Sequence, residues 1–162
     1  MNKKLILFCG IILSLQLSKA QNTEADYRSI VQSNFSGLDL ENKLLFINVW
    51  QSSDMDSRMN NKEFIRVSDI YKQAKLKGAS KGVCYINICL DKSISLWEIS
   101  LKRDSITVTD KCFINNSDKF DSLLKEFGSK PGNVVVNNNG EVIKTGLNKE
   151  TCFKFFNSLI TR

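Results

Sequence analysis

Apolar runs of strand length alternate along this chain with segments whose apolar residues recur every three or four positions. A continuous apolar run predicts a strand buried on both faces, and the three-to-four spacing predicts a helix with one buried side. Strands are expected over 44–50, 82–90, 132–137 and 141–145, with a short one over 106–109. Four helical stripes are formed by Phe64, Val67, Tyr71 and Ala74, by Ile94, Trp97 and Leu101, by Phe120, Leu123, Leu124 and Phe127, and by Cys152, Phe155, Phe156 and Leu159.

Glycine and asparagine residues mark where these elements end. The first long helix is expected between Asp54 and Lys77, stopping near Gly78, and Gly128 is placed to cap the third helix at its carboxyl end. The segment 138–140 reads Asn-Asn-Gly, a tight hairpin turn between the last two strands. Strands that alternate with helices and then form a hairpin predict an α/β sandwich, a mixed β-sheet with helices on both faces.

The amino-terminal 20 residues have the layout of a secretory signal peptide. Lys3 and Lys4 precede an apolar run over 5–17, and Ala20 ends a small-residue exit. A membrane anchor is the rival interpretation, but the run is shorter than the roughly 20 residues that a bilayer core needs. We therefore expect cleavage after Ala20, a periplasmic or extracellular location and no stable membrane span in the mature chain.

The remaining chain divides into a lead-in segment over 21–42 and one domain over 43–162. The lead-in is polar, with a weak helical trace at Tyr27, Ile30 and Val31. About 140 residues suffice for one domain with a real core. Loss of the lysines in the signal segment lowers the formal net charge from +6 to +3, and no long basic block remains, so no nucleic-acid partner is expected.

Four cysteines follow the signal segment, since Cys9 lies within it. An exported chain meets an oxidising compartment, but sequence alone does not choose among the three full pairings of Cys84, Cys89, Cys112 and Cys152. Cys84 and Cys89 should point to opposite faces of one strand, whereas Cys89 and Cys112 are candidate neighbours, as a disulfide or as a redox pair. The chain has no histidine and no zinc-type cysteine spacing, so no metal and no cofactor are expected.

The candidate chemistry gathers where the first strand meets the long helix. Trp50 ends the strand, and Asp54, Met55, Asp56 and Ser57 begin the helix. Asp54 is interpreted first as an N-cap, because an aspartate there accepts from free backbone N–H groups and is worth about 1 kcal/mol. A repurposed site at the positive end of the helix is the second interpretation.

Three segments resemble the thioredoxin-like superfamily, especially its exported TlpA/ResA-like branch and the related AhpC/TSA-type redoxins. Residues 44–58 resemble the strand, tryptophan, CxxC and arginine of that family, with Asp54 and Ser57 in the cysteine positions. Residues 83–92 resemble the next strand, which ends in an aspartate, here Asp91. Residues 131–140 resemble the segment of the family's cis-proline, strand and turn glycine, which implies a cis bond before Pro131. The resemblance covers roughly residues 38–160, about one ordinary domain.

The resemblance implies a substrate groove whose usual thiol chemistry is missing. The groove residues carried over are Trp50, Asp54, Met55, Asp56, Ser57, Lys130 and Pro131. A thiolate is the attacking species in disulfide exchange, and neither a carboxylate nor a hydroxyl replaces it. The first hypothesis is therefore a redox-inactive protein that binds polypeptide or a partner protein, with the backbone before 133–137 offering strand-like pairing.

Two other hypotheses stay open beside the binding protein. One is a thiol-disulfide oxidoreductase, serving cell redox homeostasis through displaced cysteines such as Cys89 and Cys112. The other is a structural or accessory subunit without a groove function. An exposed sulfur of low pKa would favour the enzyme, and inert, buried cysteines would favour the other two hypotheses.

Overall fold

The computed structural model describes residues 26–35, 37–107, 112–115 and 118–161. The predicted signal peptide and the first residues of the lead-in lie outside this range. The elements in chain order are α1 (Tyr27–Asn34), β1 (Leu44–Trp50), α2 (Met55–Tyr71), β2 (Val83–Cys89), α3 (Ile94–Arg103), β3 (Cys112–Ile114), the 3-10 turn η1 (Asp118–Phe120), α4 (Asp121–Glu126), β4 (Gly132–Val136), β5 (Val142–Thr145) and α5 (Lys149–Ser158).

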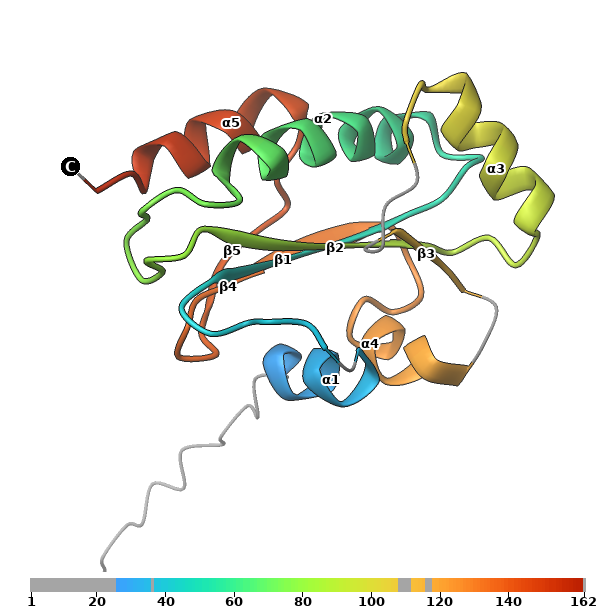
Figure 1. The fold of residues 1–162 in the computed structure, drawn as a ribbon. Coiled ribbons are helices and arrows are strands. Elements are labelled where there is room, and N and C mark those ends of the chain that lie inside the picture. Colours follow the sequence, from blue (N-terminus) through green and yellow to red (C-terminus); the bar gives the residue numbers. More distant parts are fainter. Residues whose placement is uncertain (1–25, 36, 108–111, 116–117, 162) are drawn as a thin grey trace, which may run out of the picture.

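The five strands form one mixed sheet in the order β3-β2-β1-β4-β5. The three strands β1, β2 and β3 run parallel, and β4 and β5 are antiparallel to their neighbours. Helices α2, α3 and α5 cover one face, and α1 and α4 cover the other (Figure 1). The predicted α/β sandwich with a mixed sheet is therefore confirmed.

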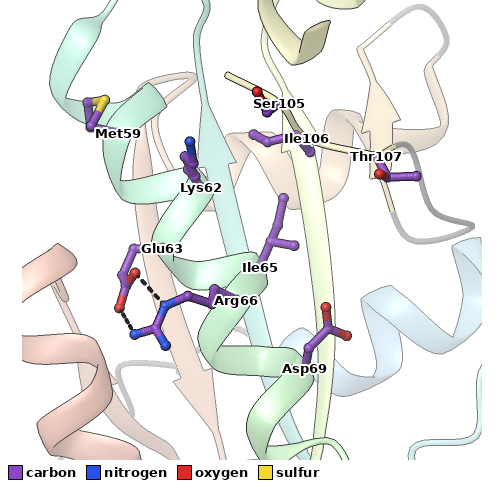
Figure 2. A pocket seen from close by; sticks show the side chains of 9 residues that line it. All are labelled: Met59, Lys62, Glu63, Ile65, Arg66, Asp69, Ser105, Ile106 and Thr107. Carbon is purple, nitrogen blue, oxygen red and sulfur yellow. Dashed lines mark hydrogen bonds and ion pairs between the residues drawn. The ribbon is translucent and has the colours of Figure 1, made fainter. Parts of the chain in front are cut away.

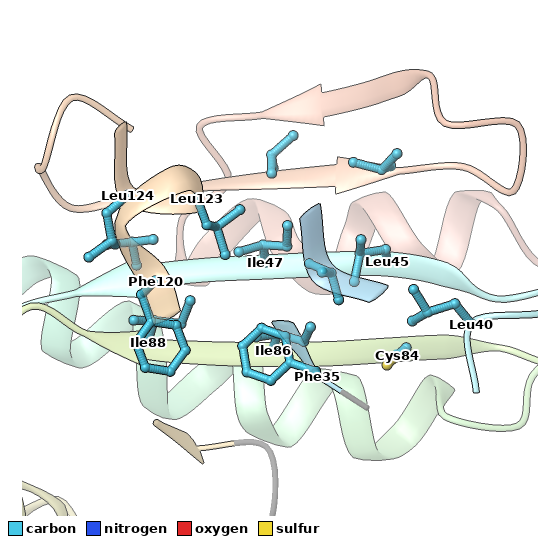
Figure 3. Packing of buried hydrophobic residues seen from close by; sticks show 14 residues of the cluster. Phe35, Leu40, Leu45, Ile47, Cys84, Ile86, Ile88, Phe120, Leu123 and Leu124 are labelled. Carbon is cyan, nitrogen blue, oxygen red and sulfur yellow. The ribbon is translucent and has the colours of Figure 1, made fainter. Parts of the chain in front are cut away.

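Strands β1 and β2 are buried along their whole length, as their nearly continuous apolar sequences predict. Alternate residues of β1 divide between two cores: Leu45 and Ile47 face α1 and α4, and Leu44 and Phe46 face α2 and α5. Figure 3 shows the first of these cores, where Phe35, the residue after α1, lies over β2. A smaller cluster, formed by Trp50, Cys89 and Leu101 with Trp97 and Ile106, attaches α3 to the sheet.

The long helix α2 ends at Tyr71, six residues before the predicted end at Lys77. The chain turns there because the backbone of Gly82 lies against the carboxyl end of α2. A Cβ on Gly82 would stand 2.4 Å from the Tyr71 carbonyl oxygen, and its φ is +85°. Only glycine fits this combination of close approach and left-handed backbone.

The short edge strand is β3, at 112–114, and not the predicted 106–109. Residues 106 and 107 are not in a strand, and 108–109 lie outside the described residues. The reason is that α3 ends in a turn: Ser105 has a φ of 56°, and the Ile106 N–H donates to the Leu101 carbonyl at 2.9 Å. Ile106 thereby packs beside Trp97.

The predicted helix cap and hairpin are both present. Gly128 follows α4 with a φ of 58°, and Gly140 in the β4–β5 turn has a φ of 90°. Asn137 shapes this turn, because its Oδ1 accepts from the N–H groups of Asn139 at 2.9 Å and Glu141 at 3.0 Å. Among the described residues, no helix is both long and apolar enough to cross a bilayer.

Candidate functional site

The amino-terminal end of α2 is capped by its own residues. Asp54 is the N-cap, and its Oδ1 accepts from the Ser57 N–H at 2.8 Å. Ser57 Oγ accepts from the Gln51 N–H and donates to the Gln51 carbonyl, both at 3.2 Å. The interpretation of Asp54 as a cap is confirmed, and both side chains already bond to the backbone.

A hollow of about 210 Å³ lies between this helix end and the start of β4. Four of the predicted groove residues line it: Asp54, Asp56, Ser57 and Pro131. The remaining lining residues are Asn48, Val49, Asn60, Phe64, Gly132 and Asn133. None of these described lining residues is a lysine or an arginine. The hollow therefore has the carboxylates of Asp54 and Asp56 at its rim, and asparagine amides and apolar residues form its wall.

The other three predicted groove residues do not line the hollow. Trp50 is fully buried in the cluster under α3, as expected for a core aromatic. Met55 is 68% exposed, and Lys130 is also exposed. Met55 directly follows Asp54 in the chain, and Lys130 directly precedes Pro131. Both therefore lie at the margins of the hollow.

The bond before Pro131 is trans, which corrects the cis-proline assignment. The turn from α4 to β4 is made instead by two successive left-handed residues, Gly128 (φ 58°) and Ser129 (φ 55°). Because Gly128 and Ser129 already reverse the direction of the chain, the Lys130–Pro131 bond has the trans form that X-Pro bonds ordinarily prefer.

The same turn removes the backbone donors expected to pair with a peptide strand. The N–H of Ser129 donates to the Leu124 carbonyl at 3.0 Å, and the N–H of Lys130 donates to the Phe127 carbonyl at 3.2 Å. Pro131 has no N–H. Strand-like pairing through N–H groups just before β4 is therefore not available, and a ligand there meets carbonyls and side chains.

A row of asparagines crosses the sheet below the hollow. Asn48 of β1 is aligned with Asn87 of β2 and Asn133 of β4. Asn133 bonds both the N–H (2.8 Å) and the carbonyl (2.9 Å) of Leu147, which ties β4 to the chain before α5. The sequence signal for this row is a lone asparagine inside each apolar strand, and it was missed.

Buried polar contacts connect that row to α2. Asn61 Oδ1 accepts from Asn48 Nδ2 and from the Tyr85 hydroxyl, both at 3.2 Å. Asn60 lies next to it in α2 and accepts from the Lys149 N–H at 2.8 Å, which anchors the start of α5. These amides connect α2, which lines the hollow, to the sheet and to the start of α5.

Asp91 organises the other side of the helix entrance. Its Oδ2 accepts from the Ser52 N–H at 3.0 Å and from Cys89 Sγ at 3.1 Å. The Cys89 thiol is completely buried, and burial raises its pKa well above the ordinary value, with the Asp91 carboxylate acting in the same direction through its side chain. A thiol in this environment stays protonated and unreactive at neutral pH.

The predicted pair of Cys89 and Cys112 is not a disulfide in the structure. Cys89 is a free cysteine. In the pairing of β2 with β3, Cys112 lies opposite Asn87, and the residue opposite Cys89 is Ile114. The side chain of Cys112 lies outside the described residues. Cys84 and Cys89 do point into different clusters, as predicted, and Cys152 is buried on α5 with a pKa raised by burial to about 12.

An ion pair that the sequence did not reveal links α2 to α3. Arg58 Nε lies 2.8 Å from Asp104 Oδ2, with side chains 14% and 8% exposed. Arg58 also reaches the Ser52 carbonyl at 3.4 Å. The two partners are 46 residues apart, so no local pattern could have paired them.

A second hollow lies along α2, away from all the predicted groove residues. It is lined by Met59, Lys62, Glu63, Ile65, Arg66, Asp69, Ser105, Ile106 and Thr107 (Figure 2). Glu63 and Arg66 form an ion pair across one turn of α2. The hydrogen bond from Arg66 lowers the pKa of the Glu63 carboxyl, and the guanidinium also lies 5.9 Å from the Phe153 ring centre. The charges of Glu63 and Arg66 thus serve contacts within α2 and with α5.

Comparison with known proteins identifies the fold. No protein-family profile matches the chain, and no curated protein matches its sequence. The thioredoxin domain of a thiol-disulfide oxidoreductase from Bacteroides vulgatus superposes with a TM-score of 0.58 at 13% identity, over 75% of this chain and 81% of that one. A thiol-disulfide oxidoreductase from Bacteroides fragilis gives 0.53 at 21% identity, over 76% and 85%. StoA from Bacillus subtilis gives 0.51 at 17% identity, over 71% and 83%. This chain has the thioredoxin-like fold.

Proposed function

We propose that this chain is an exported thioredoxin-fold protein of the TlpA/ResA-like branch that binds polypeptide in the hollow beside Asp54 and Pro131. In this proposal Asp54 and Ser57 stand in the cysteine positions of the CxxC motif that residues 44–58 resemble. The signal-like pattern over 1–20 supports export.

The observation that carries the proposal is the chemistry of the α2 amino terminus. Asp54 caps the helix and Ser57 bonds the Gln51 backbone, so both side chains serve the helix start. Disulfide exchange requires a thiolate that forms a mixed disulfide, and this position supplies only a carboxylate and a hydroxyl. Cys89, on the neighbouring strand, is buried with a raised pKa.

The hollow itself supports binding in place of catalysis. Pro131 is half-buried at its edge, so its ring can contact an aliphatic side chain of a bound polypeptide, while the Val49 and Phe64 side chains behind it are buried. Asp56 is exposed at its rim, so the rim presents negative charge to an approaching chain. Because the nearby N–H groups are engaged within the α4–β4 turn, recognition falls to side chains and carbonyls.

A disulfide-reduction assay tests the loss of chemistry. The wild-type chain should reduce insulin in the presence of dithiothreitol no faster than dithiothreitol alone. The Asp54→Cys/Ser57→Cys variant should gain activity, because the helix start would then lower the pKa of the introduced thiol. Wild-type activity that disappears in Cys89→Ser would instead establish the displaced-cysteine oxidoreductase.

A charge-reversal pair tests the binding half of the proposal. The probe is a reduced, alkylated and fluorescently labelled unfolded polypeptide, followed by anisotropy. Asp56→Lys, at the rim of the hollow, should weaken its binding by at least about tenfold. Asp69→Lys makes the same charge change on an exposed part of the same helix, away from this hollow, and should leave binding unchanged. Equal effects of the two variants, or no binding by the wild type, would refute the proposal.

A further inference from the structure

Helix α3 exposes apolar residues where a helix of this kind normally presents polar ones. Ile94, Leu96 and Ile99 are 51%, 54% and 61% exposed. Ser100, by contrast, is buried at 3% exposure. Helices on the surface of a domain ordinarily turn their apolar stripe inward and their polar face to water. Leu96 and Ile99, three positions apart, therefore give α3 an unpartnered apolar stripe, whereas Ile94, two positions before Leu96, lies on the opposite side of the helix.

The attachment of α3 to the domain accounts for only one side of the helix. Trp97 and Leu101, one turn apart, pack against Trp50 and Cys89. The helical repeat of 3.6 residues places Leu96, Ile99 and Arg103 on a different stripe, since these positions follow i, i+3 and i+7 spacing. Figure 1 shows α3 at the end of the helical layer, with its outer side away from α2 and α5.

The charges beside this stripe are self-complementary. Glu98 and Lys102 lie on the same flank, and neither has an ion-pair partner within the part of the chain that the structure describes. In an antiparallel pair of identical helices, each flank faces the same flank of the other copy. An axis near Ile99 would therefore bring Glu98 of each copy next to Lys102 of the other, about 3 Å apart along the helix axis.

We propose that two copies of this chain pair through their α3 helices, antiparallel about a two-fold axis near Ile99. The two copies bury Ile99 on the axis and Leu96 beside it, and two reciprocal Glu98–Lys102 ion pairs flank the apolar contact. A second copy is the occupant that this arrangement favours, because one helix carries both members of the charge pair on the flank that an antiparallel copy of the same helix would face. The inference does not depend on the proposed polypeptide binding.

The predicted dimer is weak and reversible. A ten-residue helix is about 15 Å long, so two such helices bury an area at the low end of specific interfaces, below about 1,200 Å². Dissociation constants in the high-micromolar range, about 100 µM, are expected for such a contact. The dimer should therefore appear only in concentrated samples.

Sedimentation equilibrium of the purified full chain, from about 10 µM to about 1 mM, tests the pairing. The wild type should show a reversible monomer–dimer equilibrium, and Ile99→Lys should raise the dissociation constant by at least about tenfold. Ile70→Lys is the matched control, because Ile70 is 50% exposed on α2. Circular dichroism should show that both variants keep the wild-type fold.

Reversing the charges tests the antiparallel register. Glu98→Lys alone and Lys102→Glu alone should each weaken the dimer, and the double variant Glu98→Lys/Lys102→Glu should restore it. A chain that stays monomeric at the highest concentration would overturn the proposal. Equal weakening by Ile70→Lys, or failure of the double reversal to restore association, would overturn it as well.

Discussion

Removal of the Asp104 carboxylate should destabilise the protein more than the loss of an ordinary surface ion pair. Asp104 follows α3 and holds the Arg58 guanidinium of α2 at 2.8 Å. Both side chains are largely buried, at 8% and 14% exposure. Asp104→Ala therefore leaves a cation with little water around it, and only the 3.4 Å contact with the Ser52 carbonyl remains.

The size of the effect follows from the burial of the pair. Two unit charges 2.8 Å apart attract each other by about 6 kcal/mol at an effective dielectric constant of about 20. Desolvation of the charges offsets part of this attraction, and breaking a buried pair by deleting one partner costs about 3–5 kcal/mol. Because Arg58 is slightly exposed and keeps one carbonyl contact, we expect a loss of about 3 kcal/mol.

Urea unfolding followed by circular dichroism measures this loss, with the slope of the transition expected to stay unchanged. The thermal midpoint should fall by about 10 °C for a domain of this size. A double-mutant cycle with Arg58→Met isolates the pair: Asp104→Ala in the Arg58→Met background should cost much less than alone. Arg103→Met is the control, since Arg103 is 52% exposed and lies 3.9 Å from Asp104.

The reasoning would be refuted by an Asp104→Ala variant that loses less than about 1 kcal/mol, the usual value for a solvated pair. Additive effects of the two substitutions would refute it too, because they would mean that the two side chains do not interact.

Three further predictions concern the N-cap of α2, the attachment of α1 and the buried thiol of Cys152. Asp54→Ala should lower the unfolding free energy by about 1 kcal/mol and Asp54→Asn should change it little, because asparagine also caps; urea midpoints distinguish them. Arg28 donates to the carbonyls of Leu40, Lys43 and Asn137 at 2.5, 3.0 and 3.1 Å, so Arg28→Met should cost about 2 kcal/mol and speed hydrogen exchange in α1 before the sheet opens. Burial raises the pKa of the Cys152 thiol from 9.0 to about 12; the unfolded chain then loses that proton first, so the unfolding free energy should fall between pH 9 and pH 12. A Cys152→Ala variant with the same pH slope would contradict this.

Helix caps, turns and buried strands could be predicted from the sequence, because each depends on residues close together in the chain. The N-cap at Asp54, the hairpin glycine Gly140 and the cap glycine Gly128 all depend on backbone geometry and hydrogen bonds within about four positions. The unbroken apolar sequence of β1 and β2 likewise indicated strands buried on both faces. From these local patterns the layered α/β architecture followed.

Features that depend on long-range packing were decided only by the tertiary structure. The edge strand lies at 112–114 and not at 106–109, because Ile106 packs against the cluster of Trp50, Cys89 and Leu101. The trans bond before Pro131 accompanies a turn whose left-handed residues the resemblance did not indicate. In both places local pattern admitted more than one conformation, and packing selected one.

The candidate site divides in the same way. Of the groove residues that the resemblance implies, Asp54, Asp56, Ser57 and Pro131 line one hollow in the structure, whereas Trp50 is completely buried. The partners of Arg58 and Asn61 come from distant elements, and a side chain's hydrogen bonds across such distances exist only after the core has closed. Short-range propensity therefore determined the helix caps and the hairpin turn, and burial in the tertiary structure determined which polar groups meet.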